Sequence, residues 1–136
     1  MRVPDQQPQT TTEKDSTLTL KRLKLGPRMS EAVCIGDIAF LAGQVPDDLG
    51  ADITEQTKQV LANMDAVVKE LGASKADIAS IQVWLADMSD FQGMNAVWDE
   101  WVDRVSPPAR ATGGVALARA GMRVEMIAVV AIPKSV

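Results

Sequence analysis

The chain has 136 residues, of which 46% are hydrophobic, and its 18 acidic and 14 basic residues give a net charge of -4. This length fits one domain. No apolar stretch approaches the roughly 20 residues that span a membrane. An acidic chain without a basic face is unlike a nucleic-acid-binding protein. Histidine is absent, and Cys34 is the only cysteine. These counts exclude Ser-His or Cys-His catalysis, the usual zinc sites and an intramolecular disulfide, and no convincing carboxylate cluster suggests another metal.

Residues 1–16 are polar and rich in Pro, Gln and Thr. They offer little apolar surface to offset the entropy of ordering, so we expect a disordered arm followed by one domain over residues 17–136. The same segment lacks the apolar core of a secretory signal, and a cytoplasmic location is therefore expected.

Three strands are predicted first. Thr17–Leu25 alternates polar and apolar residues up to a break at Gly26-Pro27. Ala32–Ile35 and Ile38–Ala42 flank Gly36-Asp37, an arrangement typical of a hairpin.

A long helix is predicted next. Asp52 with Glu55 three residues later has the pattern of an N-cap followed by a capping-box acid, and Gly72 supplies the stop. Apolar residues at helical spacing give this helix one stripe that faces the core: Ile53, Val60, Leu61, Met64, Val67, Val68 and Leu71.

The second half of the chain predicts a strand, a helix and two more strands. Ile78–Met88 is the strand, and Ser89 followed by Gln92 is expected to cap the helix. The apolar stripe of that helix is Phe91, Met94, Trp98, Trp101, Val102 and Val105, with the amide of Asn95 on the same stripe. Arg110–Ala118 and Met122–Ile132 are the last two strands.

The predicted order βββαβαββ favours a two-layer α/β domain, in which a mixed sheet carries both helices on one face. Strands such as Ile78–Met88 are apolar on both faces. We therefore expect a homo-oligomer interface to cover the face without helices. Trp84, Trp98, Trp101 and Cys34 are interpreted as core residues.

Glu125 is a lone carboxylate in the apolar run 124–130, and such a charge needs compensation. Arg110, fifteen positions upstream, could face the same pocket. Its planar guanidinium suits a substrate carboxylate, while Glu125 offers an acid/base group with a pKa that burial can tune. Two structural alternatives are that Arg110 and Glu125 neutralise each other, or that Arg123 pairs with Glu125. Asn95 either ties down a loop or lines a pocket.

Several short motifs occur in a specific order and spacing: Gly26-Pro27, Ala42-Gly43-Gln44-Val45-Pro46, Asn95, Pro108-Ala109-Arg110-Ala111 and Val124-Glu125. In these the chain resembles, from Leu18 to Ile132, the RidA/YjgF family of enamine/imine deaminases. The resemblance implies a chorismate-mutase-like fold and a homotrimer with three clefts between neighbouring subunits.

The resemblance also implies hydrolysis of 2-aminoacrylate-type enamines and their imines, made by PLP-dependent dehydratases, to 2-keto acids and ammonia, without a cofactor. Arg110 would hold the carboxylate of this small-molecule substrate, and Glu125 would position water or relay a proton. Backbone N–H groups near Thr112 could help to hold the carboxylate, and Asn95 and Gly43 would line the pocket.

Three positions depart from the family pattern: Arg28 replaces the common Tyr, Ala42 the usual Ser, and Thr112 the frequent Cys. Arg28 could bind a second acidic group of the substrate, or it could be a solvated surface residue. The alternative function is a trimer of the same family that binds a small ligand or acts as a chaperone-like or regulatory protein without catalysis. A nuclease, as attributed to some relatives, is disfavoured by the acidic charge and the absence of histidine.

Overall fold

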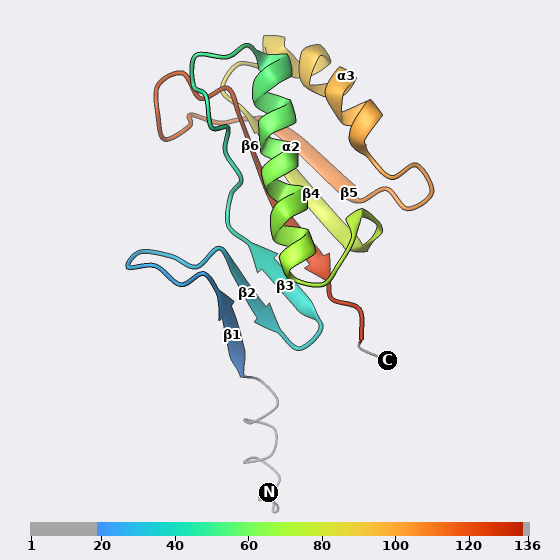
Figure 1. Cartoon of the computed structure of the whole chain (residues 1–136). Coiled ribbons are helices and arrows are strands. Elements are labelled where there is room, and N and C mark those ends of the chain that lie inside the picture. The colour runs from blue at the N-terminus through green and yellow to red at the C-terminus, as the bar shows by residue number, and fades with distance from the viewer. Residues whose placement is uncertain (1–18, 135–136) are drawn as a thin grey trace, which may run out of the picture.

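The structure, a computed structural model, describes residues 19–134 and contains one six-stranded sheet with the order β1-β2-β3-β6-β4-β5 (Figure 1). The strands are β1 (Leu20–Leu23), β2 (Ala32–Ile35), β3 (Ile38–Leu41), β4 (Ile78–Leu85), β5 (Ala109–Gly114) and β6 (Val124–Ala131). Only β4 and β5 are parallel, and all the other neighbours are antiparallel. The sheet is therefore mixed, as predicted.

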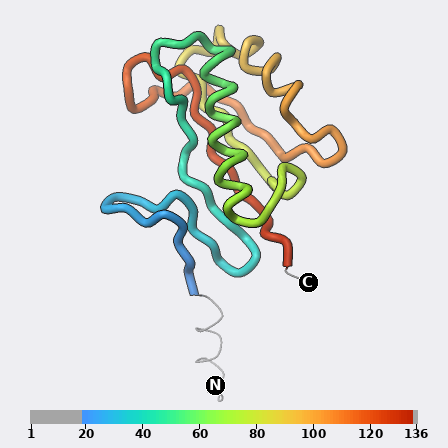
Figure 2. Tube along the Cα trace, in the orientation of Figure 1, coloured from blue at the N-terminus to red at the C-terminus, as the bar shows by residue number. Residues whose placement is uncertain are grey.

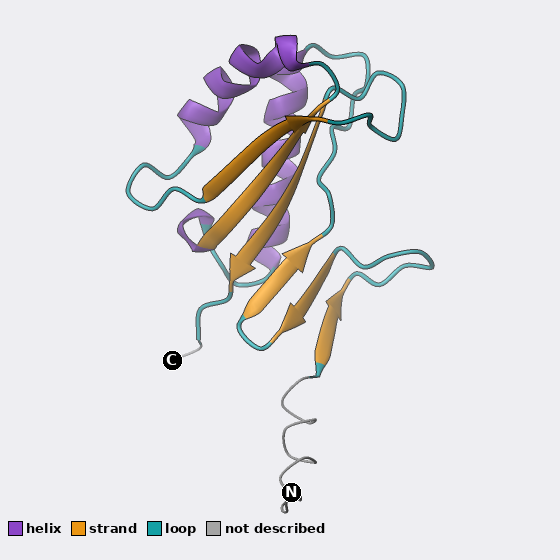
Figure 3. Cartoon of the chain, turned by 180° about the vertical axis from the view of Figure 1, so that it is seen from behind, coloured by secondary structure: helices purple, strands orange, loops and turns teal. Residues whose placement is uncertain are grey.

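Two helices, α2 (Ile53–Glu70) and α3 (Phe91–Trp101), cover one face of the sheet, as the view from behind shows (Figure 3). The core lies between the two layers and includes Ala39, Leu61, Met64, Ile81, Val83, Met94, Val124, Met126 and Val130. Short 3-10 turns at Lys75–Asp77 and Met88–Asp90 precede β4 and α3. The two-layer βββαβαββ arrangement is confirmed.

The start and stop of α2 follow the predicted signals. The Asp52 side chain accepts a hydrogen bond from the Glu55 amide at 2.9 Å, which satisfies one of the free N–H groups of the first turn. Beyond Glu70, Gly72 has a φ of 78° and donates its N–H to Lys69 O at 3.0 Å. A left-handed residue is easiest for glycine, so the helix ends there.

The predicted limits of α3 are wrong at both ends. Ser89 is not its cap: the carboxylate of Asp87 accepts from the Ser89 amide at 2.9 Å, which starts the 3-10 turn, and α3 begins only at Phe91. At the other end Val102 has an extended ψ of 143°, so the helix stops at Trp101. Val105 is 92% exposed and does not belong to the apolar stripe.

β2 has the predicted bounds, whereas the other strands end earlier than predicted because the chain continues there as loops. The predicted first strand shrinks to β1, and its first residues, like the predicted disordered arm over 1–16, lie outside the described residues. β4 ends at Leu85 rather than Met88. Residues 115–123 form a loop between β5 and β6 instead of extending both strands.

β3 diverges from β6 after a short stretch of pairing. The paired residues run from Ile38 with Ala131 to Phe40 with Val129. The chain then runs beside β6, joined to it by a bridge between Gln44 and Met126, before it enters α2 (Figure 2). This divergence separates the three N-terminal strands from the rest of the sheet and places residues 42–47 next to β6.

The face of the sheet without helices exposes large apolar side chains, among them Leu20, Ile35, Ile38 and Phe40 at 38% to 47%. Such a surface is typical of a protein interface. Along residues 19–134, no helix has the length and apolar character needed to cross a bilayer.

Candidate active site

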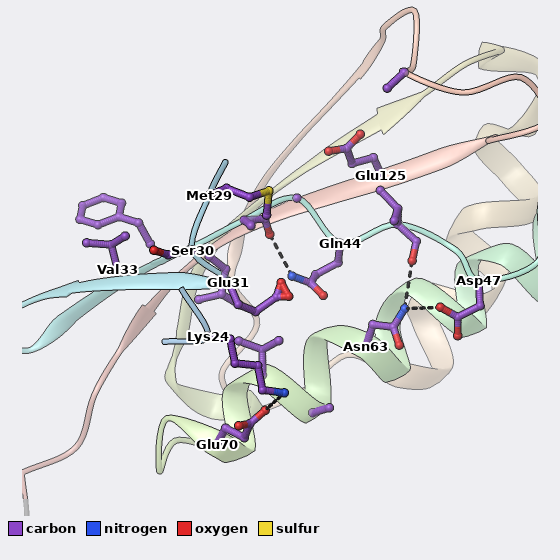
Figure 4. Close-up of a pocket in the computed structure, with 18 of the residues that line it drawn as sticks. Lys24, Met29, Ser30, Glu31, Val33, Gln44, Asp47, Asn63, Glu70 and Glu125 are labelled. Atoms are coloured by element: carbon purple, nitrogen blue, oxygen red, sulfur yellow. Dashed lines mark hydrogen bonds and ion pairs between the residues drawn. The ribbon is translucent and has the colours of Figure 1, made fainter. Parts of the chain in front are cut away.

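A cavity of about 940 Å³ lies where the N-terminal strands diverge from β6 (Figure 4). One wall comes from α2 through Asn63, Val67 and Glu70, and another from the loop that precedes β6, through Arg119 and Met122. Residues 42–45 and Glu125 lie between them, and residues of the N-terminal strands and their connection, such as Met29 and Val33, complete the lining. The cavity is thus built from parts of the chain that are far apart in the sequence.

Glu125 enters this cavity from the face of the sheet without helices. Its neighbours Val124 and Met126 are both 0% exposed and point into the core, so the alternation of a strand turns Glu125 the other way. It stands opposite Trp84 in the β4–β6 register. Burial raises the pKa of the Glu125 carboxyl above its ordinary value, which extends the pH range over which it can donate a proton.

Gly43 provides the space that the Glu125 carboxylate occupies. A Cβ atom at residue 43 would collide with Oε2 of Glu125 and lie 2.9 Å from Cδ. Glycine is therefore required by close approach, since no larger residue fits without moving the carboxylate. The structure brings together Gly43 and Glu125, two of the candidate site residues.

The wall beside Gly43 is held by hydrogen bonds on both sides. Gln44, 5% exposed, exchanges backbone hydrogen bonds with Met126 at 2.8 and 3.0 Å, and its side chain donates to Ala42 O at 2.9 Å. Asn63 of α2 donates to Val45 O at 3.0 Å. Each end of the wall is thereby tied to a regular element, which fixes the position of Gly43.

Gln56 holds the opposite wall and was missed by the sequence analysis. This side chain is 0% exposed and donates to Ala51 O at 3.1 Å and Gly121 O at 2.8 Å, while its Oε1 accepts from the Arg123 amide at 2.8 Å. It thus ties α2 to the loop that precedes Glu125. The available signal was its position, three residues after Ile53 and four before Val60 on the apolar stripe.

Arg110 lies elsewhere. In the parallel β4–β5 pair it stands opposite Ile81, a core residue, so it belongs to the helix-covered face. Its Nη1 donates to Asn95 Oδ1 of α3 at 2.8 Å. Glu125 belongs to the other face of the sheet. Arg110 and Glu125 of one chain therefore do not share a pocket, in contrast to the expectation from the sequence.

Neither arginine neutralises Glu125 within residues 19–134. Arg123 forms an ion pair with Asp90 at 3.2 Å, so the alternative in which it pairs with Glu125 is wrong. The other ion pair of this region joins Lys24 to Glu70 at 2.8 Å on the rim of the cavity, where Glu70 raises the pKa of Lys24. In the described part of the chain, Glu125 is thus partly buried and forms no ion pair.

The remaining candidates are separated from the cavity. Thr112, two residues after Arg110 on β5, has a buried hydroxyl without a hydrogen-bond partner in the described chain. Arg28 is exposed and is absent from the cavity lining, although its neighbours Met29 and Ser30 are part of it. Within residues 19–134, no group of three or more Cys, Asp or Glu side chains is placed to hold a metal ion.

The sequence and the fold can be compared with those of known proteins. The family model described as endoribonuclease L-PSP matches residues 19–132. A RutC family protein of Haemophilus influenzae is 40% identical over 111 residues, which cover 81% of this chain and 96% of the relative. The RutC family protein YoaB of Escherichia coli is 36% identical over 115 residues, 85% of this chain and all of the relative.

Solved structures of related proteins have the same fold. A member of the YjgF protein family from Neisseria meningitidis superposes with a TM-score of 0.84 at 37% identity, over 88% of this chain and 99% of that one. A protein of Thermotoga maritima described as a putative endoribonuclease superposes with a TM-score of 0.72 at 30% identity, over 82% of this chain and 90% of that one. The fold is that of the chorismate-mutase-like α/β proteins, and the chain belongs to the RidA/YjgF family, also called the RutC or endoribonuclease L-PSP family.

Proposed function

We propose that the protein hydrolyses reactive enamine and imine intermediates of the 2-aminoacrylate type to 2-keto acids and ammonia. The observation that carries this proposal is Glu125, a carboxyl group with a burial-raised pKa in a cavity and without an ion-pair partner among residues 19–134. Such a group is suited to exchange protons with a substrate.

The site we propose is formed between copies of the chain in a homotrimer. One subunit contributes the cavity with Gly43 and Glu125, and a neighbour contributes Arg110. Two observations support this arrangement: Arg110 and Glu125 lie on opposite faces of one sheet, and the apolar face without helices is uncovered in the single chain. Arg110 would then bind the substrate carboxylate that Glu125 alone would repel.

In the proposed mechanism the protonated Glu125 first donates its proton to the terminal carbon of the enamine, which becomes an iminium ion. The resulting carboxylate then accepts a proton from water as the water oxygen adds to the carbon of the C=N bond. Glu125 then donates its proton to the nitrogen of this adduct and accepts the hydroxyl proton, so that the C–N bond breaks, ammonia and the keto acid are released, and Glu125 is protonated as at the start. The sum is enamine plus water giving keto acid plus ammonia, and no cofactor is consumed.

Some relatives are named endoribonucleases, but this chain offers little for that reaction. Its net charge is -4 and it has no histidine, whereas RNA binding is dominated by attraction between the phosphate backbone and basic side chains. The proposal therefore includes a small carboxylate substrate and no nucleic-acid partner. We also propose a cytoplasmic location without a membrane partner.

The first test measures pyruvate release from 2-aminoacrylate that a dehydratase generates in the cuvette. We expect acceleration by the wild type and little by Arg110→Ala or Glu125→Ala, because the first loses substrate orientation and the second loses proton transfer. Wild-type turnover by either purified variant contradicts the assignment. A wild type that binds pyruvate without accelerating its release indicates a ligand-binding protein instead.

A mixing experiment tests whether the site lies between subunits. Arg110→Ala and Glu125→Ala chains are co-expressed with different tags, and mixed oligomers are purified through both tags. In each mixed trimer one of the three interfaces combines an intact Glu125 with an intact Arg110 from the neighbour, so the purified mixed trimers should have about a third of the wild-type activity. A site within one chain predicts no recovery. Light scattering that shows a stable monomer would also contradict the trimer.

A further inference from the structure

We propose that Phe91, Asn95 and Trp98 form an electrically neutral cage that positions the guanidinium of Arg110 and leaves its positive charge uncompensated. The three residues follow one another at spacings of four and three along α3, so they share one face of the helix. The inference rests on the proposed function only in that the ligand of Arg110 is a carboxylate.

Two aromatic rings and one amide surround the guanidinium. Its Cζ atom lies 4.8 Å from the centroid of the Trp98 ring and 6.0 Å from that of Phe91, which is within the range of cation–π attraction. The Asn95 side chain accepts from Nη1 at 2.8 Å. Trp98 is only 7% exposed, and the core therefore fixes the ring.

None of these contacts carries a negative charge. The ion pairs found within residues 19–134 are Lys24 with Glu70 and Arg123 with Asp90, and neither involves Arg110. An aspartate at position 95 would give a stronger, charge-assisted hydrogen bond, but it would also cancel the charge. An amide gives the same geometry at no electrostatic cost to a ligand, and this is the residue present.

The cage determines what remains available for binding. Asn95 occupies Nη1 and the rings attract the guanidinium through its π-facing surface, so the N–H groups of Nη2 and Nε are left to grip a carboxylate in a planar, two-point manner. Asn95 is then a positioning residue that acts through Arg110. Its oxygen already accepts one hydrogen bond, from Arg110 Nη1.

Binding of pyruvate, measured by titration calorimetry, tests the cage directly. Asn95→Asp keeps the shape and the acceptor but adds a charge, and we expect its Kd for pyruvate to rise at least about tenfold. If Asn95 were only a structural tether, aspartate would bind Arg110 at least as well and the Kd would not rise. An unchanged Kd for Asn95→Asp therefore overturns the inference.

The rings are tested by Trp98→Leu and Trp98→Phe. Losing the aromatic face should raise the Kd and the KM about five- to thirtyfold, with kcat at saturation near the wild-type value, and Trp98→Phe should restore most of the affinity. Trp101→Leu is the matched control, since the Trp101 ring packs against Trp98 in a tilted arrangement with the centroids 5.4 Å apart but is not among the rings around Arg110. An equal rise for Trp101→Leu would show a general packing effect and overturn the role of the rings.

The outcomes separate this inference from the proposed function. A wild type that binds pyruvate but does not accelerate imine hydrolysis refutes the function and leaves the cage intact. A wild type that hydrolyses imines while Asn95→Asp binds pyruvate equally well refutes the cage and leaves the function intact. If Trp98→Leu does not fold, the Asn95→Asp result decides.

Discussion

Gly43→Ala should uncouple stability from activity, because the new methyl group and the Glu125 carboxylate require the same space. The Cβ atom would collide with Oε2 and lie 2.9 Å from Cδ and 3.3 Å from Cγ of Glu125. All three atoms belong to one flexible side chain rather than to the backbone. The side chain can therefore rotate away, at a cost of roughly 1 kcal/mol for an unfavourable rotamer.

That cost is offset by the lower entropy of the unfolded chain, which favours alanine over glycine by about 0.4–1 kcal/mol. The free energy of unfolding should then change by less than about 1 kcal/mol. Turnover should fall much further, because displacing a reacting group by about 1 Å can cost about a hundredfold in rate.

Urea denaturation gives the stability, and keto-acid release from an enamine generated in place gives the rate. Gly50→Ala is the control: its Cβ would meet only Asp48 Oδ1, at an ordinary 3.4 Å, and it should be active. If Gly43→Ala folds and turns over like the wild type, the position of the Glu125 carboxylate does not matter and our account of the cavity is refuted.

Two further predictions concern buried polar groups. Gln56→Leu leaves the Arg123 amide and the carbonyls of Ala51 and Gly121 without their hydrogen-bond partner. Urea denaturation should therefore show that the free energy of unfolding falls by about 2–4 kcal/mol. A fall of less than about 1 kcal/mol would contradict the role of Gln56 in tying α2 to the loop that precedes Glu125. Since burial raises the pKa of Glu125, the ionised carboxylate destabilises the fold above that pKa, so Glu125→Gln should melt higher than the wild type at neutral pH. The gain should vanish as the pH falls below the ordinary value of 4.5, and a gain that persists in acid would indicate another cause.

The fold was predictable because its periodic signals were strong. The α2 stripe, the Asp52 cap and the Gly72 stop together specified a helix from Ile53 to Glu70, and Gly36-Asp37 specified the β2–β3 hairpin. The start of α3 was not predictable in the same way. Asp87 and Ser89 are both good caps, and only the folded geometry decides that the Asp87 carboxylate takes the Ser89 amide.

The arrangement of the candidate site residues was not predictable from the sequence. The chain between Arg110 and Glu125 passes through the loop 115–123. A loop lacks the regular alternation of side chains found in a strand, so a separation of fifteen residues does not show on which face of the sheet each side chain lies. Pairing with Ile81 and with Trp84 decides that they differ. The neighbours of Arg110 were hidden for another reason: Phe91 and Trp98 satisfy the apolar pattern of a core and give no sign of a second role.

The position of β6 in the sheet determines the order in which this protein can assemble. β6 is the last strand of the described chain, yet it lies between β3 and β4, so the N-terminal hairpins and the β4–β5 pair share no strand until it arrives. On a ribosome, both parts must wait with the core residues Ala39 and Leu41 of β3 uncovered and α2 only partly packed. The last folding step should therefore follow the emergence of the strand that carries Glu125, and the risk of aggregation should be greatest just before it.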